Sequence, residues 1–142
     1  MYKNILVPID LSEPSSWQTA LPVAAELNQA FGAQVHVTTV VRHLDAIWQS
    51  QYSLPTYESM IAEAETRLAS VVAESFPKGL TVERTVGHGS IYAEILRTAR
   101  ESCADLIVMA SHRPDMKDYL IGANAAKVVR HASCSVLVVR KS

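Results

Sequence analysis

The chain has 142 residues, of which 49% are hydrophobic and 19% are charged, and its formal net charge is −1. This length predicts one domain over residues 1–142, and the hydrophobic content excludes a disordered chain. The charge balance offers no electrostatic footprint for nucleic acid, no apolar run reaches the roughly 18 residues of a membrane span, and no signal peptide fits the start. We therefore expect a cytoplasmic protein without nucleic-acid or membrane partners.

Short apolar runs alternate with helical patterns in the first half of the chain. The predicted elements are a strand over residues 3–10, a helix over 14–31, a strand over 34–41 and a helix over 58–76. Ser12 is the expected N-cap of the first helix, and Gly32 is its expected stop. The long connection over residues 43–57 carries Trp48 and Tyr52 and is interpreted as either a mobile flap or a partner surface.

The same alternation continues in the second half. It predicts a strand over residues 80–86, a helix over 91–102, a strand over 106–110, a helix over 124–131 and a strand over 135–140. The third strand alternates apolar and polar residues, which suits an edge strand. Strands separated by helices predict an α/β fold, in which a five-stranded parallel sheet carries helices on both faces. We expect the strand order 3-2-1-4-5 with right-handed crossovers.

Polar residues gather where such a sheet would bind a ligand. Ligands of these sheets bind beyond the carboxyl ends of the strands, where the strand order reverses, which here is between the first and fourth strands. Asp10 closes the first strand, and Ser111, His112 and Arg113 follow the fourth. Gly122 then precedes the last helix, whose unpaired N-terminal amides and dipole favour an anion. The sequence therefore predicts a phosphate-binding crevice.

Several of these residues have a second interpretation. Asp10 is either a polar contact for the base or ribose of a nucleotide or a capping residue of the following turn. Gly122 either admits a phosphate to the backbone or only forms a tight turn. Ser111 and His112 are not expected to form a nucleophile–base pair, because adjacent side chains leave a strand in opposite directions and no nucleophile-elbow glycines surround the serine. His88 lies in a Gly-x-Gly sequence that fits a helix-entry turn.

Metal binding by protein side chains alone is not expected. The histidines share no metal-ligand spacing, and the two cysteines, Cys103 and Cys134, form no CxxC pair. Both cysteines are interpreted as reduced and mostly structural thiols, as in a cytoplasmic protein.

Four segments of the chain stand out together. They are MYKNILVPID at the start, VGHGSIYAEI and DLIVMASH in the second half, and GANAAKVVRHASCSVLVVR near the end. These segments resemble the universal stress protein family, and the resemblance covers the whole chain in order. The loop ASHRP resembles the F-like branch of that family. The resemblance implies five parallel strands, a homodimer and, in many members, bound ATP or another adenine nucleotide, with or without Mg²⁺.

The resemblance also implies which residues form a nucleotide site. Family members bind the nucleotide with the signature G-x2-G-x9-G-[ST], whose fixed positions correspond here to Ala110, Arg113, Gly122 and Ala123, with the long spacer one residue shorter. Position by position, the implied nucleotide contacts are Pro8, Ile9, Asp10, Val40, Met109, Ala110, Ser111, His112, Arg113, Gly122, Ala123, Asn124 and Ala125. Residues 8–10 resemble the loop around the base and ribose. Val40 resembles the residue whose backbone meets the adenine edge, and residues 122–125 resemble the phosphate-binding turn. Asp10 could also meet Mg²⁺ carried by the nucleotide.

The last strand resembles the dimer edge of the family. That edge is formed here by Val136, Leu137, Val138 and Val139. A bare apolar edge strand risks aggregation, so pairing with a second copy of the chain is physically sensible.

Three hypotheses about function follow. The leading one is a homodimeric stress-response module that binds ATP or another adenine nucleotide and signals by its occupancy to an unknown protein partner. The second is a nucleotide-free dimerisation or scaffold module, because Ala110, Arg113 and Ala123 depart from the signature. The third is a slow ATP hydrolase, which would need a metal and a positioned water, and the sequence supplies no dedicated base beside candidates such as Asp10 and Asp115.

Overall fold

The computed structural model describes residues 1–42, 56–111 and 123–140. The predictions for the connection at 43–55 and for the loop at 112–122 lie outside the described residues.

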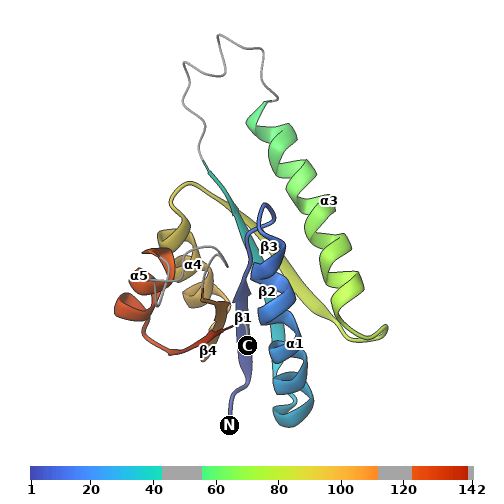
Figure 1. Cartoon of the computed structure of the whole chain (residues 1–142), viewed down its shortest axis with the longest axis vertical. Coiled ribbons are helices and arrows are strands. Elements are labelled where there is room, and N and C mark those ends of the chain that lie inside the picture. Colours follow the sequence, from blue (N-terminus) through green and yellow to red (C-terminus); the bar gives the residue numbers. More distant parts are fainter. Residues whose placement is uncertain (43–55, 112–122, 141–142) are drawn as a thin grey trace.

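A parallel sheet organises the fold (Figure 1). Its strands are β1 (Asn4–Pro8), β2 (Gln34–Val41), β3 (Val82–His88), β4 (Leu106–Ala110) and β5 (Ser135–Val139), and their order is β3-β2-β1-β4-β5. Each neighbouring pair runs parallel. The predicted fold class and strand order are therefore confirmed, including the edge position of the third strand.

Helices cover both faces of the sheet. They are α1 (Pro14–Phe31), α3 (Tyr57–Ser75), α4 (Ile91–Glu101) and α5 (Ala123–His131). α1 and α3 pack on one face and α4 and α5 on the other, so the long α3 stands apart from α4 and α5 in Figure 1. β1 is therefore buried on both faces. Ile5 and Val7 belong to the core on one face, and Leu6 belongs to the core on the other. A strand covered on both faces consists of a nearly continuous run of apolar residues. Of the described helices, none is both long and apolar enough to cross a membrane.

The first helix covers the predicted residues, but its N-cap and the end of the first strand differ from the prediction. β1 ends at Pro8, so Asp10 lies beyond the strand instead of closing it. The helix begins at Pro14 with Glu13 in the N-cap position, and Ser12 is therefore not its N-cap. The reason is that both the backbone N–H and the hydroxyl of Ser12 donate to Oδ1 of Asp10, at 2.9 and 2.6 Å. These bonds place Ser12 in a turn that precedes the helix.

The third strand and the last helix are also shifted. β3 runs over Val82–His88 rather than 80–86, because it pairs along β2 as far as Val41, the partner of His88. His88 therefore ends a strand, and the helix-entry turn is made by Gly89, whose φ of +104° favours glycine. α5 begins one residue earlier than predicted, at Ala123. The other ends lie within one residue of the predicted positions.

Candidate functional site

A cavity of about 740 Å³ opens at the carboxyl ends of β1, β2 and β4. The central strands form its floor, and its walls come from the turn after β1, from α3 and from the first turn of α5. Its volume is within the range of roughly 300–1,000 Å³ that small-molecule sites have. The cavity lies at the point of the sheet where the sequence predicted a crevice.

Each predicted nucleotide contact within the described ranges lines this cavity. These residues are Pro8, Ile9, Asp10, Val40, Met109, Ala110, Ser111, Ala123, Asn124 and Ala125. His112, Arg113 and Gly122 lie outside the described residues. The fold therefore brings segments that are far apart in the sequence to one cavity, while their contacts with a ligand stay a prediction.

The backbone that follows β1 is fixed to β2 by two hydrogen bonds. The Ile9 N–H donates to the carbonyl O of Thr38 at 2.8 Å, and the Thr39 hydroxyl donates to the carbonyl O of Ile9 at 2.9 Å. All three residues are buried. Because buried hydrogen bonds are costly to break, this side of the cavity is preformed.

Asp10 organises the turn between β1 and α1. Its Oδ1 accepts both hydrogen bonds from Ser12, and its backbone N–H donates to Oγ of Ser16 at 2.9 Å. The turn interpretation of Asp10 is therefore confirmed. The residue is exposed and lines the cavity, and its second carboxylate oxygen has no hydrogen-bond partner in the described part of the chain. Its contact with a ligand stays a prediction.

The first turn of α5 forms the opposite wall. Ala123, Asn124 and Ala125 line the cavity there, and the first amides of a helix have no partner within the helix. This turn carries no acidic side chain, whereas Arg130 and His131 occupy the last turn. Backbone donors and helix dipole therefore both favour an anion at this wall.

The α3 side of the cavity was missed by the sequence analysis. Met60, Glu63, Ala64 and Arg67 line it, and their spacing of three and four residues places them on one helix face. The Nη2 of Arg67 donates a 2.7 Å hydrogen bond to the carbonyl O of Leu11, which ties α3 to the turn after β1. Helical periodicity could have indicated this face, but not its partner, because the contact joins residues 56 positions apart.

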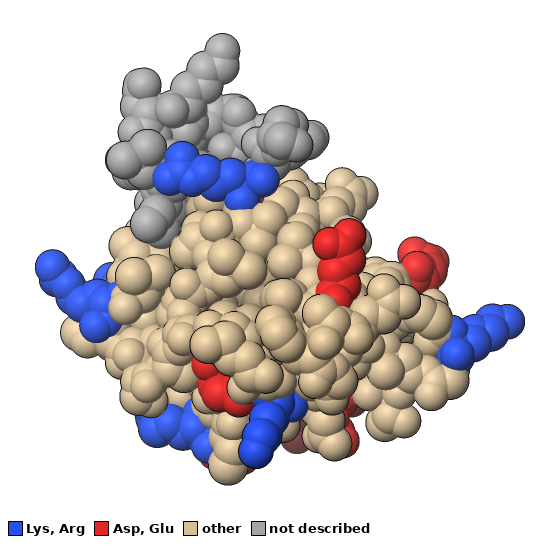
Figure 2. All heavy atoms as spheres, turned by 90° about the horizontal axis from the view of Figure 1, so that it is seen from below, with Lys and Arg blue, Asp and Glu red and all other residues tan. Residues whose placement is uncertain are grey.

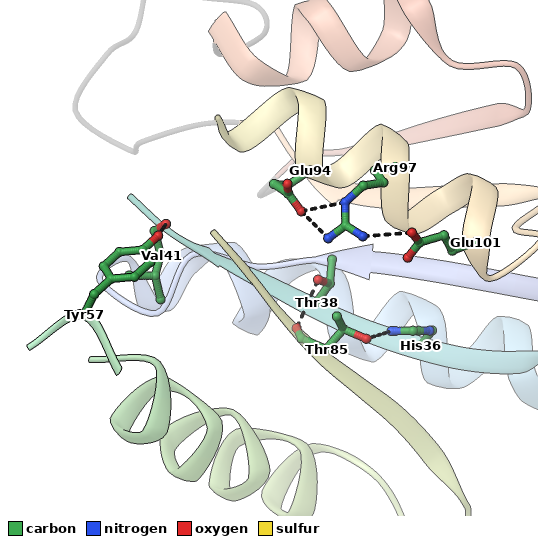
Figure 3. A network of polar contacts seen from close by, with 8 residues as sticks. All are labelled: His36, Thr38, Val41, Tyr57, Thr85, Glu94, Arg97 and Glu101. Carbon is green, nitrogen blue, oxygen red and sulfur yellow. Dashed lines mark hydrogen bonds and ion pairs between the residues drawn. The ribbon is translucent and has the colours of Figure 1, made fainter. Parts of the chain in front are cut away.

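Two donors hold the end of β2 beside the cavity. The carbonyl O of Val41 accepts from the Gly89 N–H at 3.0 Å and from the Tyr57 hydroxyl at 3.3 Å (Figure 3). Burial raises the pKa of Tyr57 above its ordinary value, and the Glu94 carboxylate acts in the same direction. The phenol therefore stays protonated, and remains a donor, at neutral pH. Since Val40 and Val41 both line the cavity, these bonds fix its β2 wall.

Charges of both signs surround the cavity. Its lining includes the acidic residues Asp10, Glu13 and Glu63 and the basic residues Arg42 and Arg67. The face of the molecule in Figure 2 likewise carries basic and acidic side chains in small separate groups. Within the described ranges, no group of three or more His, Cys, Asp or Glu side chains could hold a metal ion. Anion recognition in this cavity would use backbone amides and single side chains.

Comparison with known proteins identifies relatives along the whole chain. Residues 1–140 match the model of the universal stress protein family. The chain is similar to universal stress protein G of Escherichia coli O157:H7, with 32% identity over 143 residues that cover 99% of this chain and 100% of the relative. Among solved structures, it is similar to universal stress protein UspA from Lactobacillus plantarum, with 26% identity, a TM-score of 0.73 and 98% of both chains covered.

Two solved structures with this fold contain adenine nucleotides. A universal stress protein from Archaeoglobus fulgidus was solved in complex with dAMP and is 21% identical, with a TM-score of 0.66 and coverage of 97% of this chain and 98% of that one. Another universal stress protein, in complex with cAMP, is 23% identical, with a TM-score of 0.62 and coverage of 99% and 98%. The family match over residues 1–140, with 32% identity to a full-length relative, shows that the chain belongs to the universal stress protein family.

Proposed function

We propose that this chain binds ATP or another adenine nucleotide in the cavity at the ends of β1, β2 and β4, and that its occupancy is the signal it gives in a cytoplasmic stress response. The observation that carries the proposal is the joining of two unlike walls in one cavity of about 740 Å³. One side includes apolar residues such as Ile9, Val40 and Met60, and the other presents the opening amides of α5. A nucleotide has the matching pair of parts, a flat base and a charged phosphate tail.

The orientation of the nucleotide follows from these walls. The phosphates would lie against the backbone amides of Ala123 to Ala125, where the helix dipole favours negative charge. The base would lie towards Ile9, Val40 and the α3 side. The dAMP and cAMP complexes of other universal stress proteins support adenine nucleotides as the ligand class.

Mg²⁺ would reach the site with the phosphates of ATP. Asp10 is the candidate protein contact, because its second carboxylate oxygen has no partner among the described residues and the residue lines the cavity. Oxygen ligands suit Mg²⁺, which commonly binds through one or two carboxylates and substrate phosphates.

The departures from the family signature weaken this binding without abolishing it. Ala110 is the smallest replacement for glycine and still admits close approach of a ligand. Ala123 loses the hydroxyl of the usual Ser or Thr but keeps its backbone N–H. Loss of one neutral hydrogen bond costs roughly 0.5–1.5 kcal/mol, about a tenfold loss of affinity. A nucleotide-free scaffold is the competing function, and these same departures favour it.

The proposal includes a homodimer formed through β5. This strand lies at the edge of the sheet, and Leu137 on it is 39% exposed. Pairing of two β5 strands would cover Val136, Leu137, Val138 and Val139 and the unpaired backbone groups of the edge. The protein partner that reads the occupied state is of unknown identity.

Calorimetric titration with ATP and Mg²⁺ tests the nucleotide site directly. Ala123→Ser restores the signature hydroxyl and is expected to tighten binding up to about tenfold, the value of one added hydrogen bond. Ala123→Asp places a carboxylate against the phosphates and is expected to weaken binding about tenfold or more. The same carboxylate in the first helical turn favours the helix, so the folded state should not lose stability.

The outcome that contradicts the proposal is equally clear. If the unchanged chain and Ala123→Ser both fail to bind ATP, ADP and AMP at millimolar concentration, the scaffold function is favoured instead. If ATP binds but Ala123→Asp leaves its affinity unchanged, the phosphates do not lie at α5.

A further inference from the structure

The α3 wall of the cavity carries a cationic side chain, Arg67. Met60, Ala64 and Arg67 recur on one face of α3, and all three line the cavity. α3 packs over β2 and β3, whereas α5 packs beside β5. The two helices therefore lie towards opposite edges of the sheet, with the cavity between them. Arg67 therefore lies at the end of the cavity away from the α5 amides.

Among the described residues, Arg67 uses little of its hydrogen-bonding capacity. A guanidinium has five N–H donors and no acceptor. Within residues 1–42, 56–111 and 123–140, its one hydrogen bond is the 2.7 Å bond from Nη2 to the carbonyl O of Leu11, and no carboxylate lies within ion-pair distance. That bond fixes the guanidinium at the turn that follows Asp10. Its ligand partner must offer acceptors, because Arg67 can only donate.

The base of a nucleotide supplies acceptors at this end. If the phosphates occupy the α5 amides, the base extends across the end of β1 towards α3, where Leu11 and Ala64 offer apolar surface. The ring nitrogens of a purine are hydrogen-bond acceptors, and a guanidinium can donate one N–H to such a nitrogen while its Nη2 stays on the carbonyl O of Leu11.

We propose that Arg67 is a base-binding residue that donates a hydrogen bond to a ring nitrogen of the purine base, while its bond to Leu11 holds it in place. This inference rests on the proposed function, since it assumes that a nucleotide occupies the cavity with its phosphates at α5. The ligand class is a purine nucleotide, and the contact is made at the base rather than at the phosphates.

Ligands with and without a base separate this role from a structural one. We expect Arg67→Met to weaken binding of both ATP and adenosine about tenfold, the value of a hydrogen bond to a charged donor, and to leave tripolyphosphate unchanged. Arg67→Lys keeps the charge but loses the separate N–H groups that can serve Leu11 and the base at once, and it should recover only part of the loss. Arg100→Met, on the exposed last turn of α4, is the matched control and should change nothing.

Each other outcome overturns the inference in a recognisable way. An equal loss for tripolyphosphate would mean that Arg67 only holds the turn after β1. A loss for ATP without a loss for adenosine would mean that it contacts phosphate. An unchanged affinity of Arg67→Met for ATP and adenosine would remove Arg67 from the site while leaving the proposed function intact. Failure of the unchanged chain to bind ATP would overturn the proposed function, and this inference with it.

Discussion

Among the described residues, Asp10 serves the turn with one carboxylate oxygen, and we propose that the other meets a ligand. Oδ1 accepts both bonds from Ser12, so the residue is needed for local structure as well as being placed at the cavity. A mutation must therefore separate these two tasks, and the amide of asparagine does so because it keeps one acceptor oxygen and loses the charge.

We expect Asp10→Asn to keep the stability of the unchanged chain and to lose the Mg²⁺-dependent part of ATP affinity. Asp10→Ala should lose that part too and also destabilise the fold by about 1 kcal/mol, because the Ser12 bonds lose their acceptor. Urea unfolding and ATP titration with Mg²⁺ or with EDTA measure both effects. An Asp10→Asn chain that retains full Mg²⁺ dependence would show that the carboxylate does not meet the ion.

Gly89 occupies a backbone conformation that other residues rarely adopt. Its φ is +104°, and its N–H bonds the carbonyl O of Val41 at the cavity edge. Gly89→Ala should destabilise the fold by about 1–3 kcal/mol, the usual cost of such strain. Ser90→Ala is the control, because the Ser90 side chain makes no capping bond and its loss should cost little. Equal urea midpoints for the two variants would contradict this expectation.

At the scale of elements, β2 and β3 are joined by polar side chains on the α4 side of the sheet (Figure 3). The Nε2 of His36 hydrogen-bonds with the Thr85 hydroxyl, and the Thr38 hydroxyl donates to the carbonyl O of Thr85 at 3.0 Å. Burial lowers the pKa of His36 below its ordinary value of 6.5, and the Glu83 carboxylate only partly opposes this effect. The folded state therefore favours the neutral imidazole.

The stability of the sheet should consequently fall as the pH drops below 6.5. The folded pKa of His36 lies below the unfolded one, so the unfolded chain binds the proton first. The contribution of neutral His36 to the free energy of unfolding is complete above pH 6.5 and is lost as the pH falls towards the folded pKa. Urea midpoints measured from about pH 7.5 to about pH 5.5 should fall less in His36→Gln, which cannot take up the proton. Parallel pH profiles for the two chains would contradict this assignment.

The elements themselves were predictable, whereas their cross-chain contacts were not. The apolar run through Ile5, Leu6 and Val7 indicates a strand buried on both faces, and the expected strand order 3-2-1-4-5 agrees with the sheet. The residue type and position of Ser12 predict an N-cap of the first helix, but its N–H and hydroxyl donate to the Asp10 carboxylate instead. Arg67 escaped notice because local periodicity does not reveal which distant carbonyl a side chain will reach.

At the scale of the whole molecule, the exposed β5 edge is the surface that the dimer proposal needs. We expect the chain to be a dimer in solution and Leu137→Arg to shift it to monomer, because a buried unpaired charge in a strand pair is costly. Phe31→Arg is a matched control, since Phe31 at the end of α1 is similarly exposed at 40% and packs its ring against Tyr2. Light scattering after size-exclusion chromatography measures the mass. Dimers of Leu137→Arg, or monomers of the unchanged chain, would contradict the β5 interface.

The nucleotide cavity is the central claim, and backbone amide chemical shifts during a titration with ATP and Mg²⁺ test it most directly. The account predicts saturable shifts at Ala123, Asn124 and Ala125 and at Ile9 and Asp10, because all of these line one cavity. Asp105, before β4 at the opposite end of the sheet, serves as the internal reference and should not shift. Saturation with no shift at the α5 amides, or shifts confined to other parts of the chain, would contradict it.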